Sequence, residues 1–171
     1  NIEDICILNR VEDKQSVMVG NFKVEFISVT HSIADACALA IHTPVGTILH
    51  TGDFKVDYTP IDGRRMDLET ISKIGKKGVL LLLADSTNVE RRGHSLSEKT
   101  IGETLNRIFS GATGRVIVAT FASNIHRMQQ IVNASVANNR KVIFSGRSMV
   151  NISEVAIELV YLNIPEGYKI E

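Results

Sequence analysis

The sequence is poor in the residues that mark several classes of protein. It has no tryptophan and two cysteines, Cys6 and Cys37, which are not in C-x-x-C spacing. Two distant cysteines among apolar neighbours favour reduced thiols in a cytoplasmic protein over a disulfide. No apolar run approaches the roughly 20 residues that cross a bilayer, and no signal-peptide pattern is present. We therefore expect a cytoplasmic protein rather than a secreted or membrane-bound one.

An excess of either charge is also missing, because 19 lysines and arginines balance 19 aspartates and glutamates. The bulk charge therefore does not indicate nucleic-acid binding, although an enzyme can keep its positive charge in one groove. A hydrophobic content of 44% and a mean hydropathy of +0.08 are typical of a globular protein with a core. The 171 residues begin and end in strand-like sequence, so we expect an internal piece of a longer protein.

Apolar periodicity predicts mostly strands in the first half of the chain. Phe22 to Val29 alternates apolar and polar positions, with Phe22, Val24 and Phe26 on one face, which is typical of a half-buried strand. The uninterrupted run Val79 to Ala84 predicts a strand buried on both faces. The other elements expected here are strands over 5–8 and 16–19, a hairpin with arms over 37–42 and 47–50, and a helix over 67–74.

In the second half, strand-like and helix-like segments alternate. The segment 95–98 fits a capping box ahead of a helix with Ile101, Leu105 and Ile108 on one face, and Ser123 is a candidate cap for another helix. Such alternation predicts a mainly parallel α/β sheet, with a boundary between the two halves near residue 90. The remaining elements expected are strands over 115–120 and 141–144 and a helix over 152–162.

Three expected strands of the first half end near residues that can bind a metal or move a proton, namely His31, Asp53 and Asp85. Strand ends are where α/β folds gather active sites from distant segments. Imidazole and carboxylate are ligands suited to Zn²⁺ or Mn²⁺. Alone, however, a strand-end histidine is more often structural, an aspartate after glycine is more often a turn residue, and no H-x-H or H-E-x-x-H motif occurs.

Longer motifs around these residues resemble those of a known superfamily. Residues 28–35 (SVTHSIAD) and 43–55 (TPVGTILHTGDFK) resemble the metallo-β-lactamase superfamily, more narrowly the β-CASP nucleases and, within them, the ribonuclease J family. Residues 84–88 (ADSTN) are similar to the first acidic β-CASP motif, and residues 120–127 (TFASNIHR) resemble the corresponding ribonuclease J segment. The resemblance runs in order through nearly all of the chain.

The resemblance implies an α/β fold and roles for the strand-end residues. It implies the C-terminal portion of a metallo-β-lactamase αββα sandwich over residues 1–90 and the N-terminal portion of a β-CASP domain over residues 91–171. It also implies that His31 binds one metal, that Asp53 bridges two, and that Asp85 is the catalytic acidic residue that orients a proton-donating histidine. The implied cofactors are two divalent metals, zinc or alternatively manganese or magnesium, which activate water for attack on an RNA phosphodiester.

The chain departs from the family pattern in one large respect. It contains neither the H-x-H-x-D-H motif, which supplies most of the metal ligands, nor the later β-CASP histidines. We therefore expect little or no bound metal and no meaningful turnover from these 171 residues alone.

Other residues near the motifs have two open interpretations. Asp35 either accepts a hydrogen bond from the imidazole of His31 or serves as a turn or cap residue. His50 lies close to Asp53 in sequence, but a histidine satisfied by its strand neighbours is the simpler interpretation. Lys55 either meets a substrate phosphate or is a solvated surface lysine.

A second set of residues suggests RNA contacts. Ser123 and Asn124 open a helix, whose first N–H groups favour an anion such as an RNA phosphate. His126 and Arg127 on its first turn add charge or base contacts under the same hypothesis. Phe121 either stacks on an RNA base or belongs to the core.

The leading hypothesis is a 5′-3′ exoribonuclease and endoribonuclease that acts on single-stranded RNA in RNA decay and processing, as a homo-oligomer. A second hypothesis is another metallo-β-lactamase-fold hydrolase, such as a DNA nuclease. A third is a non-catalytic RNA-binding scaffold. The β-CASP-like second half argues against a hydrolase of small molecules, because such enzymes lack that insertion.

Overall fold

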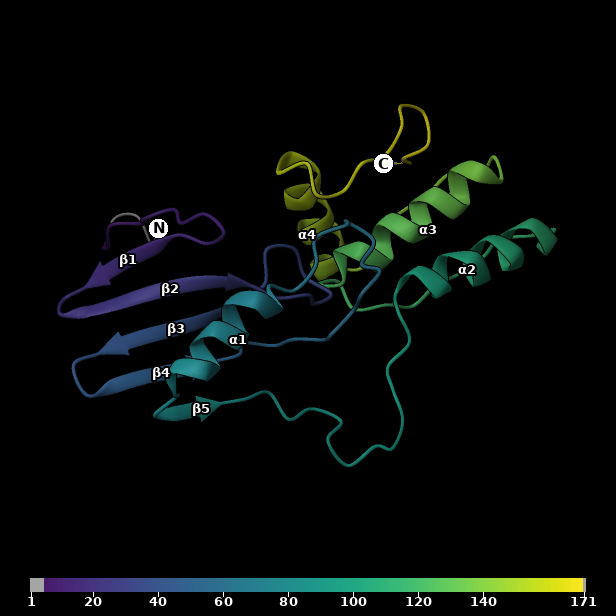
Figure 1. Ribbon diagram of the computed structural model, residues 1–171. Helices are drawn as coiled ribbons and strands as arrows, with labels where there is room; N and C mark the ends of the chain where they lie inside the picture. The colour runs from purple at the N-terminus through teal and green to yellow at the C-terminus, as the bar shows by residue number, and fades with distance from the viewer. Residues whose placement is uncertain (1–4, 171) are drawn as a thin grey trace. The chain divides into compact units, whose positions relative to one another are not determined.

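The computed structural model describes residues 5–170, which divide into two compact units (Figure 1). Within the described residues, unit 1 contains 5–29, 35–54 and 66–89, and unit 2 contains 30–34, 55–65 and 90–170. Two short segments of the first half therefore pack with the second half of the chain. The assignment of residues 1–90 and 91–171 to two family domains stays a prediction.

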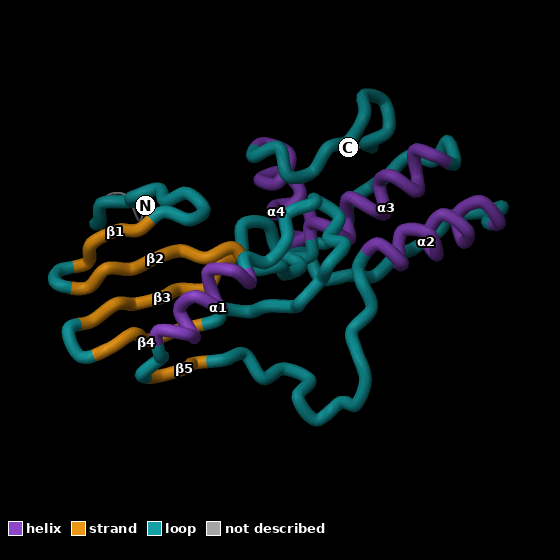
Figure 2. Tube along the Cα trace, viewed as in Figure 1, coloured by secondary structure: helices purple, strands orange, loops and turns teal. Residues whose placement is uncertain are grey.

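Unit 1 is built on a five-stranded sheet, whose strands Figure 2 shows in orange. The strands are, in spatial order, β1 Ser16–Val19, β2 Phe22–Ser28, β3 Cys37–Thr43, β4 Gly46–His50 and β5 Leu81–Leu83. Neighbours from β1 to β4 pair antiparallel, whereas β5 joins β4 in parallel. The strands β2, β4 and β5 therefore run the same way, and their carboxyl ends lie at one edge of the sheet.

Helix α1, Leu68–Lys77, packs against this sheet (Figure 1). Its Ile74 belongs to one hydrophobic cluster with Ile27 of β2 and Leu49 of β4, together with Ala38 and Ala40 of β3. Small alanines on β3 leave room for the helix over the middle of the sheet, since close packing leaves few voids. The core of unit 1 therefore lies between α1 and the central strands.

The side chain of Asp67 caps the start of α1. Its Oδ1 accepts the amide hydrogen of Thr70 at 3.0 Å and its Oδ2 accepts the Thr70 hydroxyl at 2.9 Å. The amide hydrogen bond is the largest cause that lowers the pKa of Asp67, and it outweighs the opposing effect of burial. Lys14, with its Nζ 3.9 Å from Oδ2, acts in the same direction.

Unit 2 contains three helices within the described residues, α2 Lys99–Gly111, α3 Ile125–Ala137 and α4 Arg147–Glu158. Helices α2 and α3 lie side by side and share a cluster of Leu105, Phe109 and Ala134 (Figure 1). A second cluster joins α3 to α4 and the segments beside them, and consists of Ile125, Met128, Val132, Val142, Ala156 and Leu162. No helix of residues 5–170 is long and apolar enough to cross a membrane.

Local predictions for unit 1 are largely confirmed. The strand over 16–19, the strand from Phe22, the hairpin and the helix after Asp67 are all present. Residues 5–8, however, form no strand. The expected buried face of β2 is also wrong, because Ile27, which is 1% exposed, is its most buried residue and Phe22 is exposed.

The expected burial of residues 79–84 on both faces is wrong. Only Leu81–Leu83 form a strand, and all three leucines are at least 45% exposed. β5 is an edge strand, paired with β4 alone, and its three leucines belong to none of the hydrophobic clusters of the described residues. A strand is buried on both faces only where other elements cover both of them.

The expected mainly parallel sheet of the second half is also wrong for the described residues 90–170. Residues 115–120 and 141–144 form no strand there, and the single ladder contact is an isolated parallel bridge between Val142 and Lys169. The unit is instead helical. Helix α4 begins at Arg147 rather than at residue 152, and Asn124 rather than Ser123 caps α3. The predicted capping box does not form, since Glu98 is the N-cap of α2 without a side-chain cap bond.

Helix α4 ends in a Schellman motif with an unusual residue at its left-handed position. The amide of Tyr161 donates to the carbonyl of Ala156 at 2.8 Å, and the amide of Val160 donates to that of Ile157 at 3.0 Å. Val160 has a φ of +61° and is 82% exposed. Glycine is usual at this position because a β-branched side chain strains the left-handed backbone. Val160 therefore costs stability without contributing burial.

We predict that Val160→Gly stabilises the end of α4 by about 1 kcal/mol, because it removes a left-handed strain of roughly 1–2 kcal/mol per residue. The measurement is hydrogen exchange at the amide of Tyr161, which should slow. The matched control is Val160→Ala, which removes the same exposed side chain but keeps a Cβ and should gain less. Faster exchange in Val160→Gly than in wild type would contradict the prediction.

We predict that Asp67→Ala destabilises α1 by about 1 kcal/mol near neutral pH, the usual cost of losing an N-cap. The pKa of Asp67 is lower in the folded state, so its contribution is present above the unfolded pKa and is lost as pH falls through the folded pKa. Urea unfolding from pH 7 down to pH 2 should therefore show wild type and variant converging in acid. A constant difference across that range would contradict the assignment.

Candidate functional site

The predicted site residues follow the strands that share one edge of the sheet. His31 follows β2, which ends at Ser28, and Asp53 follows β4, which ends at His50. Asp85 follows β5. The parallel register of β4 and β5 pairs His50 with Leu83, so the segments that carry Asp53 and Asp85 leave the sheet side by side. His31, by contrast, lies in a segment that belongs to unit 2.

Hydrogen bonds tie the Asp53 and Asp85 segments together. The amide of Thr51 donates to the carbonyl of Leu83 at 3.0 Å, and the amide of Asp85 donates to the hydroxyl of Thr51 at 2.9 Å. Asp85 in turn accepts the amide hydrogen of Thr87 on its Oδ1 at 2.9 Å. Thr51, which sequence reasoning did not single out, thus holds both acidic segments at the carboxyl edge of the sheet.

Gly52, between Thr51 and Asp53, is required by a close backbone approach. Its φ is +59°, and a Cβ at this position would lie 2.6 Å from the carbonyl oxygen of Cys37. Its amide donates to Nδ1 of His50 at 3.0 Å. The glycine therefore shapes the turn that presents Asp53 by packing against the neighbouring strand.

Two other histidines have structural partners on the sheet or beside it. His42 lies within 3.1 Å of Glu25 through Nε2 and within 3.2 Å of Thr47 through Nδ1. His50 accepts the hydrogen bond from Gly52 described above. Among the described residues, no group of three or more His, Cys, Asp or Glu side chains could hold a metal ion.

The segment that carries His31 is anchored by Thr30 to the loop after Asp53. The amide of Lys55 donates to the carbonyl of Thr30 at 2.7 Å, and the hydroxyl of Thr30 donates to the carbonyl of Lys55. The amide of Asp57 donates to the Thr30 hydroxyl at 3.4 Å. Thr30 is buried, so these bonds satisfy its polar groups and fix the residue next to His31.

Asp57 is a buried acidic residue that sequence reasoning missed. It is 8% exposed, and its Oδ2 accepts the hydroxyl of Ser97 at 2.9 Å and the amide of Glu98 at 3.3 Å. Its Oδ1 accepts the amide of Thr59 at 2.9 Å. Burial alone raises the pKa of Asp57, but these hydrogen bonds and the charge of Lys55 outweigh it and lower the pKa. The signal available in the sequence was the D-x-T spacing of Asp57 and Thr59, which is typical of an Asx turn.

Glu98 continues the chain of polar contacts that begins at Asp57. Its Oε2 accepts from Nη2 of Arg127 at 2.7 Å and from Nε at 3.1 Å, and its Oε1 lies 3.7 Å from Nζ of Lys55. Arg127 lies on the first turn of α3, whose cap Asn124 accepts the Arg127 amide at 2.9 Å. The guanidinium of Arg127 therefore joins α3 to the start of α2.

The other predicted contact residues are placed as follows. Phe121 is 82% exposed, so it does not belong to the core of the described chain. His126 lies 3.8 Å from the carboxylate of Asp62. Ser123 accepts the amide of Ile125 through its backbone carbonyl. Asp35 has a φ of +55°, as a turn residue does, and its contact with His31 stays a prediction.

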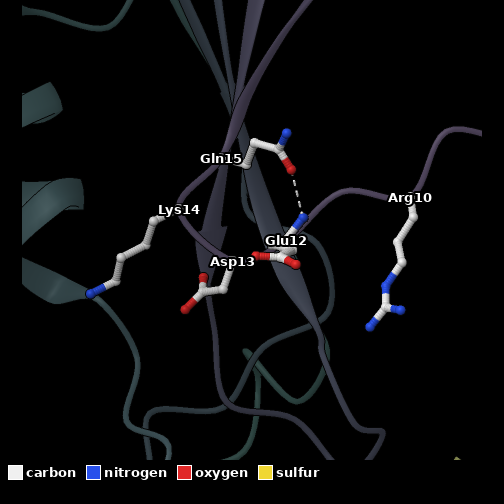
Figure 3. Close-up of a pocket in the computed structure, with 5 residues that line it drawn as sticks. All are labelled: Arg10, Glu12, Asp13, Lys14 and Gln15. Carbon is white, nitrogen blue, oxygen red and sulfur yellow. Dashed lines mark hydrogen bonds between the residues drawn. The ribbon is translucent and has the colours of Figure 1, made fainter.

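A surface pocket of the described chain lies on the loop before β1. Its lining residues are Arg10, Glu12, Asp13, Lys14 and Gln15. The amide of Glu12 donates to the side-chain oxygen of Gln15 at 2.8 Å, and the side chains of Arg10 and Lys14 point to opposite sides (Figure 3). Charges of both signs that do not converge on one point do not make a ligand site, so we assign this pocket no function.

Comparisons with known proteins identify close relatives. The family model described as ribonuclease J, beta-CASP domain matches residues 113–171. Ribonuclease J of Mycolicibacterium smegmatis is 52% identical over 157 residues, which are 92% of this chain and 28% of that protein. Ribonuclease J of Synechocystis sp. is 48% identical over 94% of this chain and 25% of its own length. The chain thus spans about a quarter of the length of these relatives.

A solved structure shows the same fold at lower sequence similarity. A protein of unknown function from Enterococcus faecalis V583 superposes with a TM-score of 0.67 at 19% identity, over 96% of this chain and 41% of that one. This likeness concerns the fold alone. The identity of about one residue in two with several ribonucleases J, along more than nine tenths of the sequence, shows that the chain belongs to the ribonuclease J family.

Proposed function

We propose that the full-length protein is a metal-dependent ribonuclease, with 5′-3′ exonuclease and endonuclease action on single-stranded RNA in decay and processing. The observation that carries the proposal is the near 50% identity to ribonucleases J along almost the whole chain. Homology to these enzymes implies metals in the full-length protein. The proposed metals are two divalent ions, with zinc foremost.

His31 and Asp53 are the proposed metal ligands of this chain, and Asp85 is the proposed acid–base partner. Support comes from the sheet, because β2, β4 and β5 present their carboxyl ends at one edge. Imidazole and carboxylate also suit the proposed ions. The sequence lacks the H-x-H-x-D-H motif that supplies most metal ligands in the family, so the remaining ligands are proposed to lie outside these 171 residues.

Asp85 is supported by the way its backbone is held. Thr51 accepts the amide hydrogen of Asp85 and also donates its own amide to β5, so Asp85 stays beside the Asp53 segment. A carboxylate fixed in this way can orient a histidine that donates a proton to the leaving oxygen. The scissile bond would be the P–O bond to that oxygen, broken as water attacks phosphorus.

Phe121 leads the proposed RNA contacts. Its ring is 82% exposed directly ahead of the α3 cap, where Ser123 and Asn124 open the helix. Exposed aromatic rings bind single strands by stacking, whatever the base. His126 and Arg127 are proposed as weaker contacts, since each already lies next to a carboxylate, Asp62 and Glu98 respectively.

We predict that His31→Ala in the full-length protein lowers RNA hydrolysis by more than about 100-fold and reduces the bound metal. Loss of a residue that merely supports a ligand already costs about 10- to 100-fold. The measurements are single-turnover cleavage of a 5′-monophosphorylated RNA and metal content by mass spectrometry. The matched control is His42→Ala, which removes a histidine bound to Glu25 and Thr47 on the sheet.

Equal metal content and activity in the two histidine variants would contradict the proposed function. Cleavage of single-stranded DNA in preference to RNA would identify a DNA nuclease instead. RNA binding without cleavage, by wild type freshly loaded with zinc or manganese, would identify a binding scaffold. Removal of metal with a chelator should abolish cleavage, and added metal should restore it.

We predict that Phe121→Ala raises the KM for single-stranded RNA by about tenfold and leaves kcat unchanged. Stacking of one base on an aromatic ring is worth about 1–3 kcal/mol. The matched control is Phe22→Ala, which removes an exposed ring from β2 in unit 1. A fall in kcat with an unchanged KM, or equal effects of the two variants, would contradict a stacking role.

A further inference from the structure

Unit 2 contains a network of polar contacts around Asp57 to which the proposed function assigns no role. Three segments distant in the sequence meet there, namely residues 30–34, residues 55–65 and the start of α2. All three belong to unit 2. Ordinary turn or cap residues satisfy donors on one segment. Asp57 instead donates its amide to Thr30 and accepts hydrogen bonds from Thr59 and from Ser97 and Glu98 at the start of α2.

One side of Asp57 faces the segment that carries His31. Its backbone amide donates to the hydroxyl of Thr30, while the amide of Lys55 donates to the Thr30 carbonyl at 2.7 Å. The Thr30 hydroxyl completes the arrangement by donating to the Lys55 carbonyl. Thr30 is 7% exposed, so it has little access to water as a replacement partner. Thr30, the residue before His31, is therefore held by hydrogen bonds from both Lys55 and Asp57.

The carboxylate of Asp57 faces the start of α2. Two donors reach its Oδ2, the hydroxyl of Ser97 and the amide of Glu98, and the amide of Thr59 reaches its Oδ1. Glu98 then holds Arg127 of α3 and Lys55. A buried carboxylate with every contact made to a donor is rigid, because loss of any donor leaves charge uncompensated. The position of the Thr30–His31 backbone is thereby tied to helices α2 and α3.

We propose that Asp57 is a positioning residue: through Thr30 it fixes the backbone that carries His31, and through Ser97 and Glu98 it ties that backbone to α2. The role rests on the proposed function of His31, and it goes beyond it by naming the residue that sets the imidazole in place. Asp57 itself does not touch the reacting atoms. If Asp57 had a purely structural role, its substitution would lower kcat no more than substitution of another capping aspartate does.

The test uses Asp57→Asn in the full-length protein, with Asp67→Asn as the matched control. Asparagine keeps the size of the side chain but has one acceptor oxygen, so either Thr59 or the pair Ser97 and Glu98 loses its acceptor. Asp67→Asn makes the same change in a helix cap that has no contact with the network. A second variant, Ser97→Ala, removes one donor and keeps the aspartate, in case Asp57→Asn does not fold.

The first readout is hydrogen exchange at the amide of Lys55, which donates to Thr30. We expect faster exchange in Asp57→Asn, a smaller increase in Ser97→Ala, and no change in Asp67→Asn. The second readout separates kcat from KM on a 5′-monophosphorylated single-stranded RNA. We expect a fall in kcat of about 10- to 100-fold in Asp57→Asn with KM unchanged, as for residues that support a catalytic group.

Unchanged exchange at Lys55 in Asp57→Asn would overturn the proposal, and so would a kcat that falls no further than in Asp67→Asn. A rise in KM in place of a fall in kcat would also overturn it, because a substrate-binding role would then be indicated. If wild type does not cleave RNA, or His31→Ala cleaves it normally, the proposed function fails instead. The exchange measurement then decides alone whether Asp57 fixes the Thr30 backbone.

Discussion

Burial of one carboxylate, that of Asp57, is the constraint on which the arrangement of unit 2 depends. A charged group removed from water requires donors on every accessible side, and these donors come from Thr59, Ser97 and Glu98. The three segments that provide or receive these bonds cannot shift independently. The segment of His31 is thus held with α2 and α3, although it directly follows strand β2 of unit 1.

In unit 1 the segments that carry Asp53 and Asp85 are held by backbone and hydroxyl groups rather than by a buried charge. Thr51 bridges the ends of β4 and β5, and Gly52 fits against the carbonyl of Cys37 where no larger residue can. Both features act on the residues just before Asp53. Two neighbouring strands that end at the same edge then need few contacts to keep the segments that carry Asp53 and Asp85 side by side.

The sequence predicted the elements that depend on neighbours along the chain. The hairpin follows from Pro44, Val45 and Gly46 between two apolar stretches. The helix expected over 67–74 is α1, Leu68–Lys77. The exposure of Leu81–Leu83 was not predictable, because it depends on which elements cover β5. The strands expected over 115–120 and 141–144 have the right composition, but a strand also needs a partner, and the described residues provide only the bridge at Val142.

Site residues divide in the same way. His31, Asp53 and Asp85 were recognisable from motif and strand position, while their roles as ligands and acid–base partner stay predictions. The D-x-T spacing indicates only a turn at Asp57; its proposed positioning role was not recognisable, because Thr30 and Ser97, on which it rests, are distant in sequence. In the sequence, a loop aspartate that is solvated does not differ from one that is buried. Hydrogen bonds from distant segments determine which of the two it is.

The charge balance of the chain bears on the RNA contacts proposed above. Equal numbers of acidic and basic residues leave the chain without an overall excess of positive charge, and Arg127 and Lys55 are next to Glu98. Pairing of this kind lowers the contribution that a cation can make to a phosphate contact, because the carboxylate must be separated from it. An exposed ring such as Phe121 carries no such cost. If RNA binds as proposed, its affinity for this part of the protein depends more on stacking than on charge, and it weakens less with added salt than phosphate-dominated binding does.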